Sequence, residues 1–305
     1  MSTYSDTIEK CRRLLMPIQP MQISLIANYT AGSGTITLNH ASTIFPSVQV
    51  GSLLSIGLND ILVTGPPNTG TGVTAVTGGV NGSTDANATS GVLADINPRF
   101  TRFDISVAIN EELQALDAPS SGLGQIIQIN NITFIPVFVG YDLGPNFDNQ
   151  RSSILEISYK IAPPWRTYPL IRRGDYRTIR NADTSVFPNG VAVVIYKTGW
   201  PGFPITVQFL APFKPLVNLS DDLLTVAGVP LNMQDIVYMG TMLRLAPDRE
   251  ISRNDASRQP DPRKAPEVPP GAMMAAGNSL YQRYLRRVNE EASRIKRAYP
   301  QREMV

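Results

Sequence analysis

Between Arg13 and Asp85 the chain carries only one charged side chain, Asp60. Short runs of β-forming residues fill this stretch, and Gly, Asn and Pro turns separate them about every eight to twelve residues. These breaks, together with many Thr, Ser and Asn side chains, exclude a membrane-spanning helix. We therefore expect residues 20–99 to form a small β-barrel or β-roll, with strands at Gln22–Ala27, Thr35–Leu38, Val48–Val50, Leu53–Ile56, Ile61–Thr64 and Val73–Val76.

Histidine and cysteine are almost absent from the 305 residues, which contain one of each, His40 and Cys11. A single cysteine excludes an internal disulfide framework and a cysteine-based zinc site, and a single histidine removes most metal and Ser-His chemistry. The 17% charged fraction also lies well below the usual level. Composition therefore points away from an enzyme. No cofactor or metal is expected, and Cys11 is interpreted as a small core residue.

Two helices are predicted to flank this β unit, over residues 5–16 and 102–116. Ser5 is the expected N-cap of the first helix, and Glu111 and Glu112 are expected to be solvated on the second. Apolar residues recur at helical spacing in both. The expected buried faces are Ile8, Cys11 and Leu15 in the first helix, and Ile105, Ile109, Leu113 and Leu116 in the second.

A second β region is predicted over about residues 125–213. Its alternation of apolar and polar residues is typical of an antiparallel sandwich or barrel with one solvated face. The expected strands are Gln125–Ile129, Ile132–Val139, Ile154–Tyr159, Val191–Tyr196 and Ile205–Leu210.

The last ninety residues are predicted to be helical with one break. Asn232, followed three residues later by Asp235, is a capping signature that opens a helix. Residues 254–271 are polar and proline-rich and are expected to form an extended linker. The expected inner faces are Met233, Ile236, Val237, Gly240 and Leu243 before the linker, and Tyr281, Leu285, Val288, Ala292 and Ile295 after it.

The predicted fold class is α+β. Because isolated short helices are unstable in water, we expect them to assemble into one small bundle from which the two β units emerge as insertions. The predicted segments are an N-terminal helix (1–19), a small β unit (20–99), a bundle helix (100–120), a second β domain (121–219), a bundle helix (220–253), the linker (254–271) and a basic C-terminal helix with its tail (272–305).

Positive charge is concentrated near the C-terminus. Residues 241–305 contain 13 Lys and Arg against 8 Asp and Glu, a net charge of +5, so the first 240 residues carry −3. A solvated helix face explains this bias, and so does contact with an acidic partner or with nucleic acid. The candidate interface residues on the last helix are Tyr281, Arg283, Arg286, Arg287, Arg294 and Arg297. A second candidate surface, for an acidic neighbour or a DNA backbone, comprises Arg166, Arg172, Arg173, Arg177 and Arg180.

Other motifs favour structural roles over chemistry. Residues 65–72 are rich in glycine but lack the Lys-Ser/Thr pair of a phosphate-binding loop, so they are interpreted as a hairpin loop. Trp165 and Trp200 each lie beside a proline and are interpreted as loop anchors, with a sugar-binding role as the alternative. No catalytic residue is predicted.

Two stretches resemble a known family. The first contains Val50-Gly-Ser-Leu-Leu-Ser-Ile, Gly79-Val-Asn-Gly-Ser83 and Ile96-Asn-Pro-Arg-Phe. The second contains Asp235-Ile-Val, Leu243-Arg-Leu, Glu267-Val-Pro-Pro-Gly and an arginine-rich helix that ends in Arg297-Ala-Tyr-Pro. Together they resemble the head-to-tail connector (adaptor) proteins of tailed bacteriophages, particularly long-tailed phages of actinobacteria. The resemblance covers most of residues 1–118 and 220–300.

This resemblance implies a non-enzymatic virion protein at the junction of capsid and tail. Connectors of this kind form a ring, here expected to hold twelve copies, that docks below the portal protein and extends the DNA channel. The implied partners are the portal, other copies of the chain, the next connector, stopper or tail-tube protein, and non-specifically the packaged DNA. The alternative is a tail-tip or baseplate adhesin that binds a surface glycan, and a glycoside hydrolase ranks third.

Overall fold

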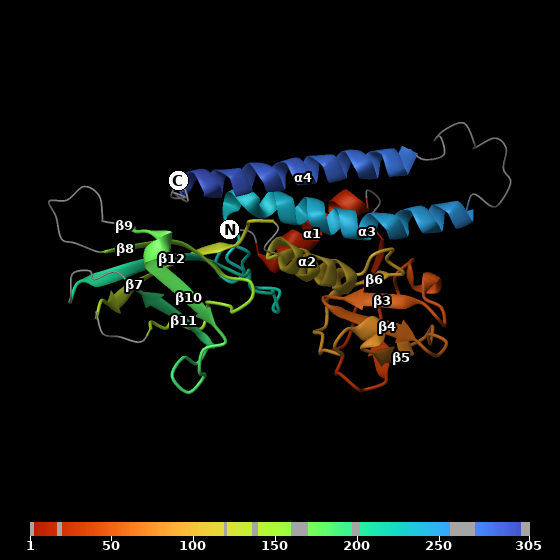
Figure 1. Ribbon diagram of the computed structural model, residues 1–305. Coiled ribbons are helices and arrows are strands. Elements are labelled where there is room, and N and C mark those ends of the chain that lie inside the picture. The colour runs from red at the N-terminus through yellow and green to blue at the C-terminus, as the bar shows by residue number, and fades with distance from the viewer. Residues whose placement is uncertain are drawn as a thin grey trace. The chain divides into compact units, whose positions relative to one another are not determined.

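The computed structural model describes residues 3–16, 20–118, 121–135, 140–159, 170–196, 202–256 and 272–299. The protein is a mixed α+β chain with antiparallel sheets, as the sequence predicts (Figure 1). It divides into two compact units. The barrel unit comprises Thr3–Glu111 and Tyr238–Gly277, and the second unit comprises Met1–Ser2, Glu112–Val237 and Asn278–Val305.

The barrel unit contains one curved, six-stranded antiparallel sheet with the strand order β1-β6-β3-β4-β5-β2. Its strands are β1 (Met21–Ser24), β2 (Thr35–Thr37), β3 (Leu53–Ile56), β4 (Asn59–Val63), β5 (Val73–Gly78) and β6 (Leu93–Ile96). A bridge between Leu25 and Leu38 joins the ends of the two edge strands β1 and β2, supported by a 3.0 Å hydrogen bond from Ile26 N to Thr37 O. The half-barrel thereby protects its own edges at this point.

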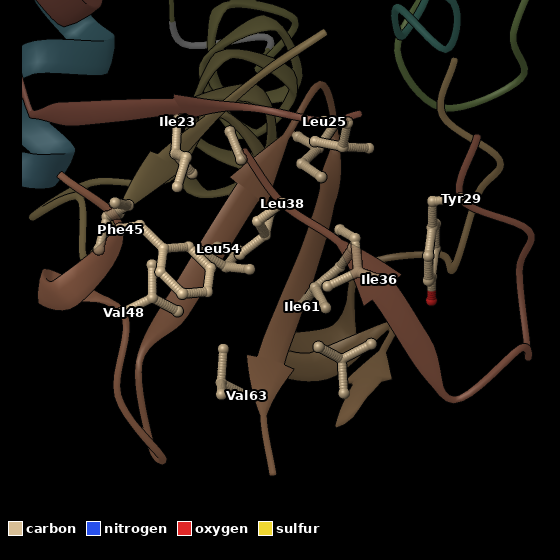
Figure 2. Close-up of a cluster of buried hydrophobic side chains, with 14 residues drawn as sticks. Ile23, Leu25, Tyr29, Ile36, Leu38, Phe45, Val48, Leu54, Ile61 and Val63 are labelled. Carbon is tan, nitrogen blue, oxygen red and sulfur yellow. The ribbon is translucent and has the colours of Figure 1, made fainter. Parts of the chain in front are cut away.

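Apolar side chains from all six strands form the core of this sheet. Figure 2 shows Leu38, Leu54 and Ile61 among the side chains that meet inside it, and each of these three is fully buried. Because successive side chains on a strand point to opposite faces, the residues between them lie on the outer face of the sheet. This outer face is polar at Ser55 and Asp60, which are nevertheless buried.

Two expectations about these strands were wrong. Val48–Val50 is not a strand, because a short 3₁₀ helix (Phe45–Ser47) places Phe45 and Val48 in the core and the chain turns there. The strand β6 was missed, since its sequence Leu-Ala-Asp-Ile carries a charge. Asn97 ends β6 with a positive φ of 44°, and its side-chain oxygen accepts a hydrogen bond from Leu53 N at 2.7 Å.

Helix α1 (Tyr4–Leu15) begins earlier than predicted. The N-cap is Thr3 rather than Ser5, because Thr3 and Asp6 exchange the two hydrogen bonds of a capping box, each 3.1 Å long. The predicted buried face of Ile8, Cys11 and Leu15 is confirmed. The hydroxyl of Tyr4 donates to Ser106 O of helix α2 (Arg102–Leu116) at 2.9 Å, which fixes one helix to the other.

The second unit contains a four-stranded antiparallel sheet in the order β7-β12-β8-β9 and a two-stranded ribbon of β10 and β11. The strands are β7 (Gln125–Thr133), β8 (Ser153–Tyr159), β9 (Leu170–Ile171), β10 (Tyr176–Arg180), β11 (Val191–Ile195) and β12 (Pro204–Ala211). Phe134, Ile157, Val193 and Phe209 belong to the single apolar core that the sheet and the ribbon share. Residues 136–139 of one predicted strand lie outside the described residues.

The C-terminal helices are α3 (Gln234–Ala256) and α4 (Ala272–Ala298). Helix α3 includes residues 254–256 of the predicted linker, whereas 257–271 lie outside the described residues. Asn232 does not cap α3: it lies in a 3₁₀ turn (Leu231–Met233), and its amide donates to Glu291 at 2.7 Å.

Two side chains of the second unit were placed on the wrong side of their helices. Glu112 was expected to be solvated, but it is 3% exposed and accepts a 2.7 Å hydrogen bond from the hydroxyl of Tyr284. Tyr281 was expected to face inward, but it is 47% exposed, so that Tyr284 provides the inward tyrosine of α4. Val288, Ala292 and Ile295 are buried as predicted.

Candidate functional site: the arginine face of helix α4

The outer face of α4 is a basic surface. A shallow hollow of about 850 Å³ runs along it, lined by Gln282, Leu285, Arg286, Asn289, Glu290, Ser293, Arg294 and Arg297. These residues recur every three or four positions, so they lie on one side of the helix. From Gln282 to Arg297 the stripe is about 22 Å long, at about 1.5 Å per residue.

Arg287 is half-buried and is held by contacts within the second unit. Its guanidinium donates to Asp235 at 2.8 Å, to Glu290 at 2.9 Å and to the carbonyl of Asn232 at 3.0 Å. Hydrogen bonding to Asp235, and then to Glu290, raises the pKa of Arg287 above its usual value. Arg287 thus fixes α4 to the start of α3, and its role at an interface stays a prediction.

Two further arginines of the predicted set are paired along the helix. Arg286 lies 3.1 Å from Glu290, and Arg294 lies 2.7 Å from Glu291. Hydrogen bonds from Arg287 and Arg286 lower the pKa of Glu290, which therefore remains ionised well into the acidic range. Such exposed pairs contribute little to stability, and Arg286, with 82% of its side chain exposed, can exchange Glu290 for another carboxylate.

Arg283 and Arg297 complete the set. Both are exposed, and neither makes an ion pair or hydrogen bond with any residue that the structure describes. They lie fourteen residues apart, close to four helical turns, and therefore project from similar directions of the helix. Of the six predicted residues, these two and the exposed Tyr281 are the ones left open for an external partner.

The structure describes four of the five residues of the second predicted basic surface. Arg172, Arg173, Arg177 and Arg180 are all exposed on or next to β10. Arg180 donates to Ser152 O at 3.3 Å, so it also secures the ribbon. Arg166 lies outside the described residues, as do Trp165 and Trp200. The strand β10 itself was not predicted, because arginines and tyrosines obscured its alternation.

The sequence did not identify the residues that decide which of these arginines are paired within the chain. Asp235 and Asn232 were interpreted as a helix cap, yet both contact α4 instead. The only signal in the sequence was the opposite charge of Asp235 on α3 and Arg287 on α4. Their spacing along the chain did not indicate that the two side chains are in contact.

Other chemistry is not evident in the described residues. Within them, no group of three or more His, Cys, Asp or Glu side chains is arranged to hold a metal ion, and no helix is long and apolar enough to span a membrane. In comparisons with known proteins, no family model, no curated protein and no solved structure matches the chain.

Proposed function

We propose that the protein is a structural component of a phage virion, a head-to-tail adaptor that forms a ring below the portal and links capsid to tail. Its helices would then form one bundle, with the two β units as insertions. The ring is expected to hold twelve copies at the junction of capsid and tail and to continue the DNA channel. The protein is not an enzyme in this proposal.

The observation that carries the proposal is the open arginine face of α4. Residues 278–299 contain six basic and two acidic side chains, a net charge of +4. Glu291 is buried and paired, and Glu290 is held by Arg286 and Arg287. A surface of this kind suits carboxylates of a neighbouring subunit or of the portal. Complementary charge at such an interface accelerates association and selects the partner.

The rotational symmetry and mass of the assembled particle test the proposal directly. Negative-stain electron microscopy and mass photometry of the purified full-length chain should reveal a closed ring of high order, twelve copies being expected. A trimer that retains a glycan on an array would refute the adaptor and support the adhesin instead.

The contribution of the arginine face is tested by the double variant Arg283→Glu/Arg297→Glu. Both side chains are exposed and unpaired among the described residues, so the fold of α4 should be preserved. We expect ring formation, or binding of the ring to its portal, to weaken at least tenfold.

Lys296→Glu is the matched control. Lys296 is exposed on the same helix but, unlike Arg297, it does not line the hollow, so assembly should change less than twofold. Unchanged ring formation and portal binding in the double variant would remove α4 from the interface. Deletion of residues 255–305 is a poorer test, because it also removes the buried Val288, Ala292 and Ile295.

A further inference from the structure

Charge is almost absent from the part of the chain that forms the half-barrel. Residues 20–97, all of which the structure describes, contain three acidic residues, Asp60, Asp85 and Asp95, and no lysine or arginine. An average composition would place about 20 charged side chains in a stretch of this length. Because charged side chains normally keep folded proteins soluble and apart from one another, a surface without them favours association.

The three carboxylates do not supply the missing surface charge. Asp60 is fully buried, and Asp95 is 2% exposed and accepts a 2.8 Å hydrogen bond from Arg12. Asp85 is half-buried and accepts hydrogen bonds from the hydroxyl of Tyr29 at 2.9 Å and from a backbone N–H at 2.7 Å. The exposed surface of the half-barrel therefore offers hydroxyls, amides and apolar groups, and no free carboxylate, lysine or arginine.

Four side chains share the open part of the outer face of this sheet. Thr37 of β2 is paired with Val73 of β5, and the backbone hydrogen bond from Ile26 N to Thr37 O places Ile26 on the other side of Thr37. Cross-strand partners point to the same face of a sheet, so these three form one row. Leu93 of β6 is paired with Ser24, two residues before Ile26, and lies on the same face.

The apolar members of this set are exposed to water. Ile26, Val73 and Leu93 are 46%, 40% and 47% exposed, whereas Leu25 and Ile36 of the same strands point into the core (Figure 2). We call Ile26, Thr37, Val73 and Leu93 the neutral face. A group of adjacent exposed apolar side chains with a polar rim is typical of an interaction surface.

A surface rich in ions is a poor partner for the neutral face. A lysine, arginine or carboxylate placed against it would lose its water without gaining an opposite charge. The covering surface should therefore be equally poor in ions. Elsewhere in the described chain, exposed ions occur on the helices and the ribbon, such as Arg13 on α1, Glu111 on α2, Arg244 on α3 and Arg177 on β10. The half-barrel itself is the charge-poor surface that the described chain offers.

We propose that the neutral face packs against the half-barrel of a second copy of this chain. Interfaces between identical subunits are more apolar than other surfaces, and their centres are depleted in charged residues. Two surfaces without free charges also approach each other without electrostatic repulsion. The inference rests on the proposed function for the presence of adjacent copies, and it gives the half-barrel a contact between copies in addition to the arginine face of α4.

Photo-crosslinking of the full-length protein identifies what covers the neutral face. The photoreactive residue p-benzoylphenylalanine replaces Thr37, and these copies are mixed with ¹⁵N-labelled copies before assembly and irradiation. We expect crosslinks to peptides from residues 20–97 of the labelled copies, identified by mass spectrometry. Crosslinks confined to other segments, or formed only within one copy, would overturn the proposal.

The double variant Ile26→Lys/Val73→Lys measures the contribution of the neutral face. Both side chains are exposed, so the circular dichroism spectrum should match that of the wild type. We expect the concentration at which half of the chains are assembled, measured by mass photometry, to rise at least tenfold. Leu14→Lys is the matched control, because Leu14 is an exposed apolar residue on α1, outside the neutral face, and should change this concentration less than twofold.

The outcomes separate this inference from the proposed function. A ring that forms equally well in the double variant would refute the neutral face and leave the adaptor intact. A small oligomer with crosslinks between half-barrels would support the neutral face and refute the ring, whereas a chain that stays monomeric at its highest soluble concentration would refute both. Retention of a glycan that is lost in the double variant would assign the face to a saccharide instead. If the double variant does not fold, the crosslinks from position 37 decide.

Discussion

Asp117 offers the sharpest test of the electrostatics in the second unit. It follows helix α2, is 4% exposed, and accepts a 2.6 Å hydrogen bond from Phe213 N through Oδ1, whereas Oδ2 is buried without a partner. Burial raises the pKa of Asp117 from 3.8 to about 6. We predict that Asp117→Asn stabilises the protein at neutral pH, because the amide oxygen still accepts from Phe213 and no charge is buried.

The size of this gain follows from the coupling between folding and the protonation of Asp117. Because the folded state holds the proton more tightly than the unfolded state, the free energy of unfolding falls as pH rises from 3.8 to about 6. A shift of about two pKa units corresponds to at most about 3 kcal/mol above pH 6. Solvent screening reduces this upper limit, so we expect a gain of about 1–2 kcal/mol at pH 7.5 and almost none at pH 4.

Urea denaturation followed by tryptophan fluorescence measures this gain. Both tryptophans, Trp165 and Trp200, belong to residues 112–237, so the signal reports the second unit. Asp117→Ala is the matched variant: it removes the acceptor of a buried N–H and should destabilise by about 1–3 kcal/mol. A gain for Asp117→Asn that is equal at pH 4 and pH 7.5, or a loss at pH 7.5, would refute the reasoning.

Two further outcomes concern the barrel unit. Arg12→Met should lower the free energy of unfolding by about 3–5 kcal/mol in calorimetry, because it leaves the buried Asp95 without its main counter-charge. The control is Arg13→Met, at an exposed neighbouring position, which should change the free energy of unfolding by less than about 0.5 kcal/mol. Cys11 is fully buried and burial raises the pKa of its thiol to about 12, so it should not react with a disulfide reagent at pH 8 until the protein is denatured. Rapid labelling of the native protein would contradict this.

Local patterns in the sequence predicted most of the elements. The buried faces of α1 and α2 follow from apolar residues at helical spacing, and four of the six predicted strands between Met21 and Val76 overlap closely with β1, β2, β3 and β4, with β5 extending beyond its prediction. Errors occurred where a local signal had two meanings. Glu112 is a charged residue of the kind that is usually solvated on a helix. It is instead buried and accepts a hydrogen bond from Tyr284, which lies 172 residues away.

Contacts between residues far apart in the chain also decided the candidate interface, and the sequence alone did not predict them. The sequence showed that the C-terminal helix is basic, and an arginine on its own gives no indication of its partner. Contacts with Asp235 and Asn232, 52 and 55 residues away, pair Arg287 within the chain. Arg283 and Arg297 remain on the open face.

By itself, the sequence determined that this is an α+β protein with a charge-poor β segment followed by basic helices, because hydrophobic periodicity and turn residues act over a few neighbouring positions. Only the tertiary structure decided which of its charged side chains are buried and which are paired with an opposite charge. Asp60 and Asp95 both look like isolated carboxylates in strands, yet strand register places them in one buried row, and only Asp95 meets an arginine. Register and helix packing bring together residues far apart in the chain, and the free energy of a buried charge depends on those neighbours.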